Sequence, residues 1–387
     1  MMDGTIREAW AALEFGDADL GDSRRTARLV QLATALGAQP TASLPAASDD
    51  PAMLKAAYRF FDNDAINPND MLASHVQATT ARLRTVRLAL AVQDTTLLDW
   101  THHPATTGLG PLASVKQQGL LAHSTLVITP DRVPLGLLAQ EVWARDAETY
   151  GQQVDHKQRA LADKESHKWV TSLQAVNAAQ EACPDTHLIS VGDREADVYD
   201  LFLEPRRARV DLLVRAAWDR RVEHEEQYLW ASVAAAPQVA TLTLRLPKQG
   251  AQPARTARLR VHQRTITLRP PKARAKEQLA PVRVWAVWAI EAQPPAGVVP
   301  IEWLLLTTYA VVDGAGALAV VEWYACRWGI EVWHKILKSG CRIEARQLET
   351  AARLQRCLTL YSVIAWRILY ATMLARVVPD APCTVLL

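Results

Sequence analysis

Residues 187–202 read H-L-I-S-V-G-D-R-E-A-D-V-Y-D-L-F, an apolar run followed by Gly192 and a polar segment. A short apolar run that is bounded by glycine is typical of a buried strand. The residues after Gly192 predict a turn and then a helix. The next apolar run, A-R-V-D-L-L-V-R, predicts a further strand that ends near Arg215.

The residues before this segment predict more strands. V-R-L-A-L-A-V-Q-D-T-T is an apolar run that ends in Asp94, and residues 123–143 read as a hairpin with Pro130 and Asp131 in its turn. A helix is expected around Lys164 to Cys183. The resulting order is three strands, a helix, a strand, a helix and a strand. This order predicts a mixed α/β (α+β) fold with an RNase-H-like core, in which helices cover a mixed sheet.

About 100 residues separate the last of these strands from a late helix near residue 324. Alternating apolar and polar residues predict several β-strands in this stretch. The runs are T-L-T-L-R-L-P, T-A-R-L-R-V-H, R-T-I-T-L-R-P, V-R-V-W-A-V-W-A-I-E and I-E-W-L-L-L-T-T. We therefore expect a β insertion at about residues 220–310 within a catalytic domain that spans residues 73–357.

Residues 1–72 predict a small helical domain. One helix begins at Asp22 or Ser23 as N-cap and stops at Gly37, and a second lies near residues 52–61. Positive charge in the first turns of a helix opposes its macrodipole, so a bound anion would relieve it. The first of these helices carries Arg24, Arg25 and Arg28 near its start. Phosphate binding is one interpretation of these arginines, and a solvated helix surface is the other.

The amino-acid composition limits the classes of protein to which this chain can belong. The chain has 387 residues, of which 49% are apolar and 22% charged, and its net charge is +2. This is ordinary globular composition, so any nucleic-acid site must be a local basic patch. The five cysteines include no C-x-x-C pair, which favours free thiols in a reducing cytoplasm over disulfides or zinc. No secretory signal is visible, and Arg367 within Leu358–Val378 favours a core helix over a membrane span.

Residues 324–338 read Y-A-C-R-W-G-I-E-V-W-H-K-I-L-K. On one uninterrupted helix, Tyr324, Arg327, Glu331 and Lys338 fall within a stripe about 60° wide and about 21 Å long. A hydroxyl, two cations and a carboxylate on one line suit a DNA backbone and a metal ion. The other interpretation is an ordinary charged surface helix with an i,i+4 pair.

Three carboxylates form the candidate metal site. Asp94 ends the first predicted strand, Asp193 follows the fourth and Glu331 lies on the late helix. Carboxylates from separate elements that meet at a sheet edge would repel one another without cations, and nucleases of this fold use two divalent ions. Individually, Asp94 could begin a turn and Asp193 could cap a helix. No nucleotide-binding fingerprint or zinc-hydrolase motif is present.

These motifs resemble the DDE transposases of the insertion-sequence-four family, the Tn-five-like enzymes with a Y-(2)-R-(3)-E-(6)-K signature. Q-D-T-T is similar to the first aspartate motif, G-D-R-E-A-D to the second and Y-x-x-R-x-x-x-E to the third. The resemblance implies a bacterial cut-and-paste transposase whose catalytic, metal-binding residues are Asp94, Asp193 and Glu331. It implies two Mg²⁺ ions, with Mn²⁺ as a possible substitute, and no nucleotide cofactor.

The resemblance also implies the partners. They are double-stranded DNA, as transposon ends and target, and a second copy of the chain in a homodimer, in a cytoplasmic protein associated with the nucleoid. Trp303 would stack on a flipped base, with Tyr324, Arg327 and Lys338 on the flanking phosphates. Residues 358–387 would form a C-terminal helix shorter than in relatives, which places dimerisation in doubt. A shortened, inhibitory DNA-binding protein and a stand-alone RNase-H-like nuclease are the alternatives.

Overall fold

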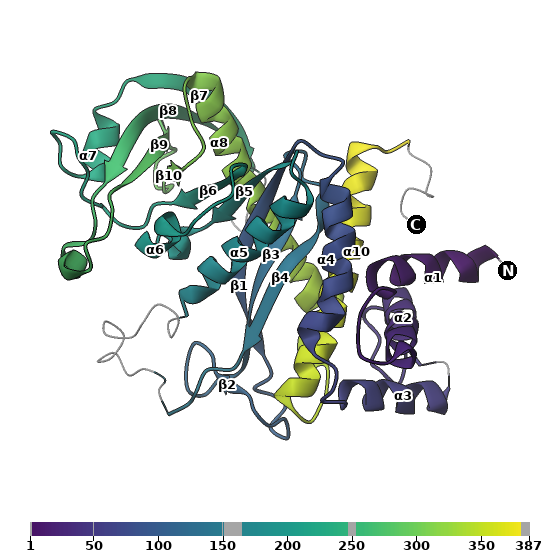
Figure 1. The fold of residues 1–387 in the computed structure, drawn as a ribbon. Coiled ribbons are helices and arrows are strands. Elements are labelled where there is room, and N and C mark those ends of the chain that lie inside the picture. The colour runs from purple at the N-terminus through teal and green to yellow at the C-terminus, as the bar shows by residue number, and fades with distance from the viewer. Residues whose placement is uncertain (1, 49, 149, 151–164, 247–252, 381–387) are drawn as a thin grey trace. The chain divides into compact units, whose positions relative to one another are not determined.

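The computed structural model describes residues 2–48, 50–148, 150, 165–246 and 253–380. The chain forms two compact units, shown in Figure 1. The first consists of Met1–Lys168, Glu181–Thr186 and Trp328–Leu387, and the second of Trp169–Gln180 and His187–Arg327.

The first unit begins with four helices: α1 (Met2–Phe15), α2 (Ser23–Ala38), α3 (Pro51–Phe61) and α4 (Pro68–Leu83). The last three start where a side chain accepts a hydrogen bond from a backbone N–H of the first turn, which stabilises a helix N-terminus. The capping residues are Asp22, Asp50 and Asn67. The predicted cap at Asp22 and the predicted helix near residues 52–61 are therefore confirmed.

The strands of the first unit are β1 (Leu88–Asp99), β2 (Gly110–Pro111), β3 (Gln118–Ile128) and β4 (Pro134–Trp143). All pair antiparallel, with β3 between β1 and β4. The predicted hairpin turn at Pro130 and Asp131 is confirmed. The prediction that the first strand ends at Asp94 is wrong, because β1 stays paired with β3 as far as Asp99 opposite Gly119.

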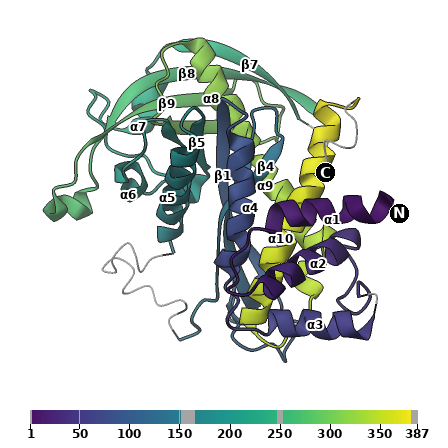
Figure 2. The same cartoon turned by 45° about the vertical axis from the view of Figure 1, so that its right-hand side comes forward.

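Helices complete the first unit after a long interval in the sequence. They are α9 (Trp328–Lys335), the π-helical turn η4 (Ile336–Gly340), the 3₁₀ turn η5 (Ile343–Ala345) and α10 (Ala351–Val377). Figure 2 shows α1, α2 and α3 gathered beside α10. The buried Arg356 of α10 donates hydrogen bonds to the carbonyls of Ile66 at 2.8 Å and Phe61 at 3.0 Å, which fastens the N-terminal helices to α10.

Helix α10 is long and apolar enough to cross a membrane, but 61% of its most apolar window is buried inside the structure. The Arg367 guanidinium lies over the ring of Trp10, 4.7 Å from its centroid. The prediction of a core helix is confirmed. The four cysteines within the described residues are free and buried, as predicted, while Cys383 lies outside those residues.

The second unit begins with most of α5 (His167–Ala182) and continues through β5 (His187–Gly192), the 3₁₀ turn η2 (Arg194–Ala196), α6 (Tyr199–Leu203) and β6 (Val210–Arg215). Strands β5 and β6 pair in parallel. The predicted order of strands and helices along the chain is therefore confirmed, and the fold is of the mixed α/β class with an RNase-H-like core.

The predicted β insertion contains α7 (Leu229–Ala234), β7 (Gln238–Leu246), β8 (Arg255–Leu268), η3 (Lys272–Glu277), β9 (Val282–Glu291) and β10 (Glu302–Thr307). The sheet runs β5-β6-β10-β9-β8-β7. T-A-R-L-R-V-H and R-T-I-T-L-R-P, predicted as two strands, form the single long strand β8. Helix α8 (Gly314–Cys326) packs on β7, β8 and β9 (Figure 1).

Candidate active site

The first candidate carboxylate, Asp94, lies in the middle of β1, opposite Ser124 of β3. Its Oδ1 accepts a hydrogen bond from the backbone N–H of Thr95 at 2.9 Å, and its side chain is 20% exposed. The Nδ1 atom of His334 lies 3.8 Å from Oδ2. The backbone thus contacts one oxygen of Asp94, and an imidazole approaches the other.

Helix α9 supplies the second candidate carboxylate, Glu331. His334 follows it by about one helical turn, so the two side chains project from the same face. Gly329 allows α9 to pack closely, because a Cβ atom at that position would lie 2.7 Å from the Cδ1 atom of Ile128. Since His334 reaches Asp94, the polar face of α9 is turned toward β1.

Two histidines of this region, His123 and His334, were not recognised from the sequence. His123 lies on β3 with its Nδ1 atom 2.9 Å from Thr95 Oγ1. Burial lowers the pKa of His123 to about 3, and the charges of Lys168 and His334 contribute to that lowering, so the ring is neutral at neutral pH. The available signal was the E-x-x-H spacing of Glu331 and His334, which recurs among metal ligands on helices.

Lys338 lies in η4, the π-helical turn that follows α9. Its Nζ donates a hydrogen bond to the carbonyl of Leu97 and lies 3.7 Å from Glu344 Oε1. Lys338 is thus anchored beside the second half of β1. π-Helical turns are rare in proteins as a whole, and those that occur often lie at functional sites. A groove of about 580 Å³ is lined by this lysine together with Asp99, His102, His103, Ser339, Arg342, Glu344 and Ala345.

The third candidate carboxylate, Asp193, belongs to the second unit and follows β5 directly. Gly192 is required before it, because a Cβ atom there would lie 2.3 Å from Cβ of Ala196. Asp193 is the N-cap of η2, and its Oδ1 accepts a hydrogen bond from the N–H of Glu195 at 2.8 Å. The capping interpretation is therefore confirmed. The capping hydrogen bond leaves room for a metal ion, because a carboxylate has about four acceptor sites.

The aromatic candidates also lie in the second unit. The rings of Trp303 on β10 and Tyr324 on α8 pack edge to face with centroids 5.5 Å apart. Tyr324 is buried, and burial raises the pKa of its hydroxyl, while the charges of Arg327 and Arg215 lower it and that of Asp193 raises it. We call Trp303, Tyr324, Arg327 and Arg215 the aromatic cluster, and the charge of Asp193 acts on it from nearby.

The continuous helix predicted across residues 324–338 is not present. Helices α8 and α9 are separated at Arg327, and η4 adds a wider π-helical turn. Tyr324 and Arg327 belong to the second unit, whereas Glu331 and Lys338 belong to the first. The prediction of one uninterrupted helix is therefore wrong at Arg327, although the backbone of Arg327 keeps right-handed helical dihedral angles. The common stripe of the four side chains stays a prediction.

The donor chemistry of the three carboxylates fits a hard divalent cation. Among the described residues, no group of three or more His, Cys, Asp and Glu side chains is arranged to hold a metal ion. Asp94 and Glu331 come from the first unit and Asp193 from the second, and each is partly exposed. Carboxylate oxygens are the ligands that Mg²⁺ prefers, and such sites retain water.

A basic groove lies between α2 and α3 in the N-terminal part of the first unit. It has a volume of about 430 Å³ and is lined by Arg24, Arg25 and Arg28 from α2 and by Lys55 and Arg59 from α3. Lys55 and Arg59 are four residues apart and so share one helix face, a signal that the sequence carried. Five cations in one groove suit a phosphate backbone.

Individual contacts hold this groove in shape. Arg24, with 90% of its side chain exposed, binds both oxygens of Asp22 through its guanidinium. Arg25 donates to the carbonyl of Leu20 at 2.9 Å, and Arg28 approaches the sulfur of Met53 on α3 at 3.8 Å. All three arginines of α2 therefore contact the protein, and Arg24 is the exposed one among them.

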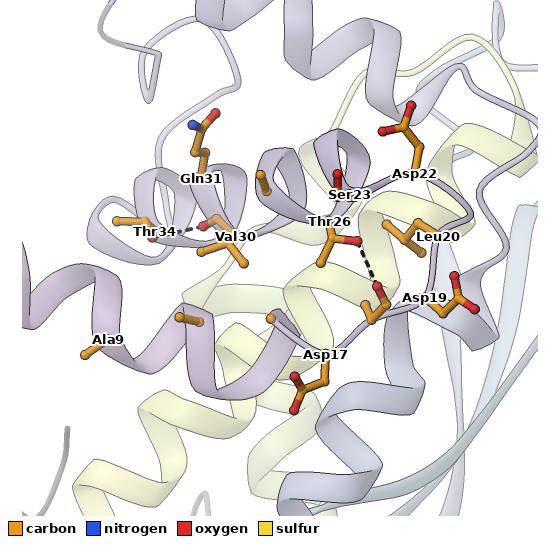
Figure 3. Close-up of a pocket in the computed structure, with 14 residues that line it drawn as sticks. Ala9, Asp17, Asp19, Leu20, Asp22, Ser23, Thr26, Val30, Gln31 and Thr34 are labelled. Carbon is orange, nitrogen blue, oxygen red and sulfur yellow. Dashed lines mark hydrogen bonds between the residues drawn. The ribbon is translucent and has the colours of Figure 1, made fainter.

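A second groove, between α1 and α2, has the opposite character (Figure 3). It has a volume of about 970 Å³ and presents Asp17, Asp19 and Asp22 beside small residues. Thr26 and Thr34 in this groove donate to the carbonyls of Ala18 at 2.8 Å and Val30 at 2.9 Å. Its carboxylates disfavour a phosphate backbone, so the α2–α3 groove is the better candidate for DNA.

Two family models match the chain. The one described as transposase DNA-binding matches residues 7–66, which include the basic groove, and the one described as transposase DDE domain matches residues 156–366, more than half of the chain. The second match includes Asp193 and Glu331, and Asp94 precedes it.

The two matches indicate what each matched part of the chain does. The first makes DNA the partner of the N-terminal helices. The second makes the mixed α/β part a transposase domain of a type that acts on DNA with divalent metal ions. The chain belongs to the family of DDE transposases.

Proposed function

We propose that this chain is the cut-and-paste transposase of a bacterial insertion sequence, and that it belongs to the Tn-five-like branch with the Y-R-E-K signature. The observation that carries the proposal is the combination of Asp94, Asp193 and Glu331 with a match to the transposase DDE domain. Its DNA partners would be the ends of the element and the target duplex, and its working form a homodimer. It would act in the cytoplasm, at the nucleoid.

Asp94, Asp193 and Glu331 would together hold two Mg²⁺ ions, for which Mn²⁺ would be a substitute. Ions at this position would supply Lewis-acid stabilisation of the transferred phosphate and activation of the attacking oxygen. The support is the donor type, since all three are partly exposed carboxylates. His334, whose imidazole approaches Asp94, would fix the orientation of that carboxylate.

The remaining side chains would hold DNA. The basic groove between α2 and α3 would bind the backbone of the end sequence through its arginines and lysine. In the aromatic cluster, Trp303 would stack on a base removed from the duplex, while Arg327 and Tyr324 would contact the adjoining phosphate. Lys338 would leave its carbonyl contact for a second phosphate.

The proposal is tested with the purified full chain and duplexes that carry the terminal sequences flanking its gene. In Mg²⁺ we expect cleavage at the end, a hairpin on that end, and joining of a pre-cleaved 3′-hydroxyl end to a supercoiled plasmid. Cleavage without joining would instead identify a nuclease. Binding with neither reaction would identify an inhibitory DNA-binding protein.

A further inference from the structure

Trp218 is the exposed aromatic residue of greatest interest in the second unit. It lies three residues after β6, and 64% of its surface is exposed. Tryptophan has a large apolar ring, so an exposed indole offers a flat surface on which a partner can stack. Its sequence setting, R-A-A-W-D-R-R at residues 215–221, places arginines on both sides of it.

The backbone that carries Trp218 is tightly held by one buried carboxylate. Oδ2 of Asp197 accepts hydrogen bonds from the N–H of Ala217 at 2.8 Å and of Trp218 at 3.1 Å. The Arg220 guanidinium donates to Oδ1 of the same aspartate at 2.9 and 2.7 Å. The indole is therefore displayed from a fixed loop.

The same loop is closed by backbone contacts on both sides. The N–H of Arg220 donates to the carbonyl of Trp218 at 2.9 Å, and the N–H of Leu229 donates to the carbonyl of Arg220 at 2.9 Å. Asp219 accepts a hydrogen bond from the N–H of Trp230 at 3.0 Å. A loop held at so many points loses little conformational entropy when a partner binds its side chain.

The loop is tied to two parts of the candidate site. Asp197 lies four residues after Asp193, directly beyond the 3₁₀ turn that Asp193 caps. On the other side, the N–H of Ala216 donates to the carbonyl of Leu304 at 2.8 Å, next to Trp303 on β10. The contacts that fix Trp218 therefore run directly to the turn of the candidate catalytic aspartate and to the strand of the candidate base platform.

We propose that Trp218 is a second stacking platform, which receives an unpaired DNA base beside the one assigned to Trp303. This inference rests on the proposed function. A fixed and exposed indole suits an unpaired nucleotide, because every base has a face that stacks. Of the flanking arginines, Arg220 binds Asp197 and Arg215 donates to the carbonyl of Glu302, so the inference rests on stacking and not on phosphate contacts. The base comes either from the end of the element or from the target duplex.

The test uses the full chain and 2-aminopurine, a fluorescent base that is quenched when it stacks. It is placed in a three-nucleotide single-stranded overhang, in one series on element-end DNA and in another on target DNA, with blunt duplexes as reference. We expect Trp218→Ala to weaken binding of one overhang series about tenfold and to abolish its quenching. Blunt duplex binding should change less than twofold, Trp218→Phe should retain most of the effect, and Tyr228→Ala, at another exposed aromatic, should behave as wild type.

The series that responds identifies the source of the base. Equal overhang binding and quenching by wild type and Trp218→Ala would overturn the inference, as would an equal loss on blunt duplexes. A change confined to self-association, measured by sedimentation, would also overturn it and indicate a protein contact. Mg²⁺-dependent cleavage is measured in the same samples. Its absence from the wild type rejects the proposed function, whereas cleavage without any effect of Trp218→Ala rejects only this inference.

Discussion

The two compact units contribute candidate residues of different chemistry. In the first, Asp94 and Glu331 are accompanied by imidazoles, and the cation Lys338 already contacts a backbone carbonyl. In the second, Asp193 is accompanied by the aromatic rings of Trp303 and Tyr324. The first set suits the binding of a metal ion, and the second suits contact with bases as well.

On the proposed function, this difference would divide the two demands of DNA transposition over the chain. Metal ligands need hard oxygen donors and a polar environment that stays partly hydrated. A displaced base needs an apolar face that offsets its loss of stacking. On the proposed function, we expect metal binding to depend on the three carboxylates and base stacking to depend on Trp303. The predictions below test that division.

The largest effect is expected from the carboxylates. Asp193→Asn and Glu331→Gln should each reduce DNA cleavage in Mg²⁺ about a thousandfold or more, because each removes a carboxylate that would hold a metal ion, and that ion would stabilise the transferred phosphate. Cleavage of a labelled end duplex measures this, and binding of the same duplex should remain within about threefold. Glu195→Gln is the matched control next to Asp193. Full cleavage by either carboxylate variant would end its assignment as a ligand.

A smaller effect is expected from the aromatic cluster. Trp303→Ala should slow cleavage about ten- to a hundredfold, through the loss of one stacked base, and should leave Mn²⁺ binding unchanged. Substituting the base that stacks with an abasic site should restore part of the rate. An effect on metal binding equal to that of Asp193→Asn would contradict the division between metal ligands and stacking residues.

The basic groove should act on affinity and not on chemistry. Replacing Arg28 or Arg59 with alanine should weaken end binding several-fold and lower the slope of log K against log salt by about one for each phosphate that the protein no longer neutralises. Gln31→Ala, in the groove between α1 and α2, is the matched control. Equal salt slopes for wild type and Arg59→Ala would exclude Arg59 from the DNA interface.

The smallest effect concerns stability of the first unit. His75 Nε2 accepts from the N–H of Leu137 at 3.0 Å, so its proton is on Nδ1, 2.5 Å from Glu14 Oε2. Burial raises the pKa of Glu14, but its interactions with His75 and Arg82 outweigh burial, so that the pKa is lowered. Glu14→Gln should lower the melting temperature at pH 7 by about 3–6 °C, without altering metal binding.

The sign of the pH dependence follows from that lowered pKa. A carboxylate whose pKa is lowered on folding stabilises the folded state at any pH above its pKa in the unfolded chain. This stabilisation is lost as pH falls through its pKa in the folded protein. The difference in melting temperature between wild type and Glu14→Gln should therefore be largest above about pH 4.5 and become smaller below it. Thermal melts from about pH 7 to about pH 3 measure this, and a constant difference over the range would contradict it.

Local signals in the sequence predicted the parts of the fold that local chemistry determines. The strand before Gly192, the hairpin turn at Pro130 and Asp131, and the cap at Asp22 each follow from residues next to one another. The end of β1 does not, because pairing of Asp99 with Gly119 extends it beyond Asp94. Likewise, the separation of α8 from α9 follows no proline and was not predicted from residues 324–338.

The candidate site divides in the same way. Asp94, Asp193 and Glu331 were identified from motifs, and their shared metal site stays a prediction. Packing of β1, β3 and α9 brings His334 near Asp94 and His123 into contact with Thr95. In the sequence, only the E-x-x-H spacing of Glu331 and His334 indicated one of these histidines. The role of Asp197 in fixing Trp218 depends on contacts across 21 residues.

The most direct test of the account is a Mn²⁺ titration of the full chain bound to end DNA, followed by electron paramagnetic resonance. We predict that wild type binds two ions and that Asp94→Asn, Asp193→Asn and Glu331→Gln each lose at least one. Asp99→Asn should bind as wild type does, because Asp99 Oδ1 accepts a hydrogen bond from the N–H of Thr101 at 2.8 Å and is not among the proposed ligands. Unchanged stoichiometry and affinity in Asp193→Asn would contradict the assignment of Asp193 as a metal ligand.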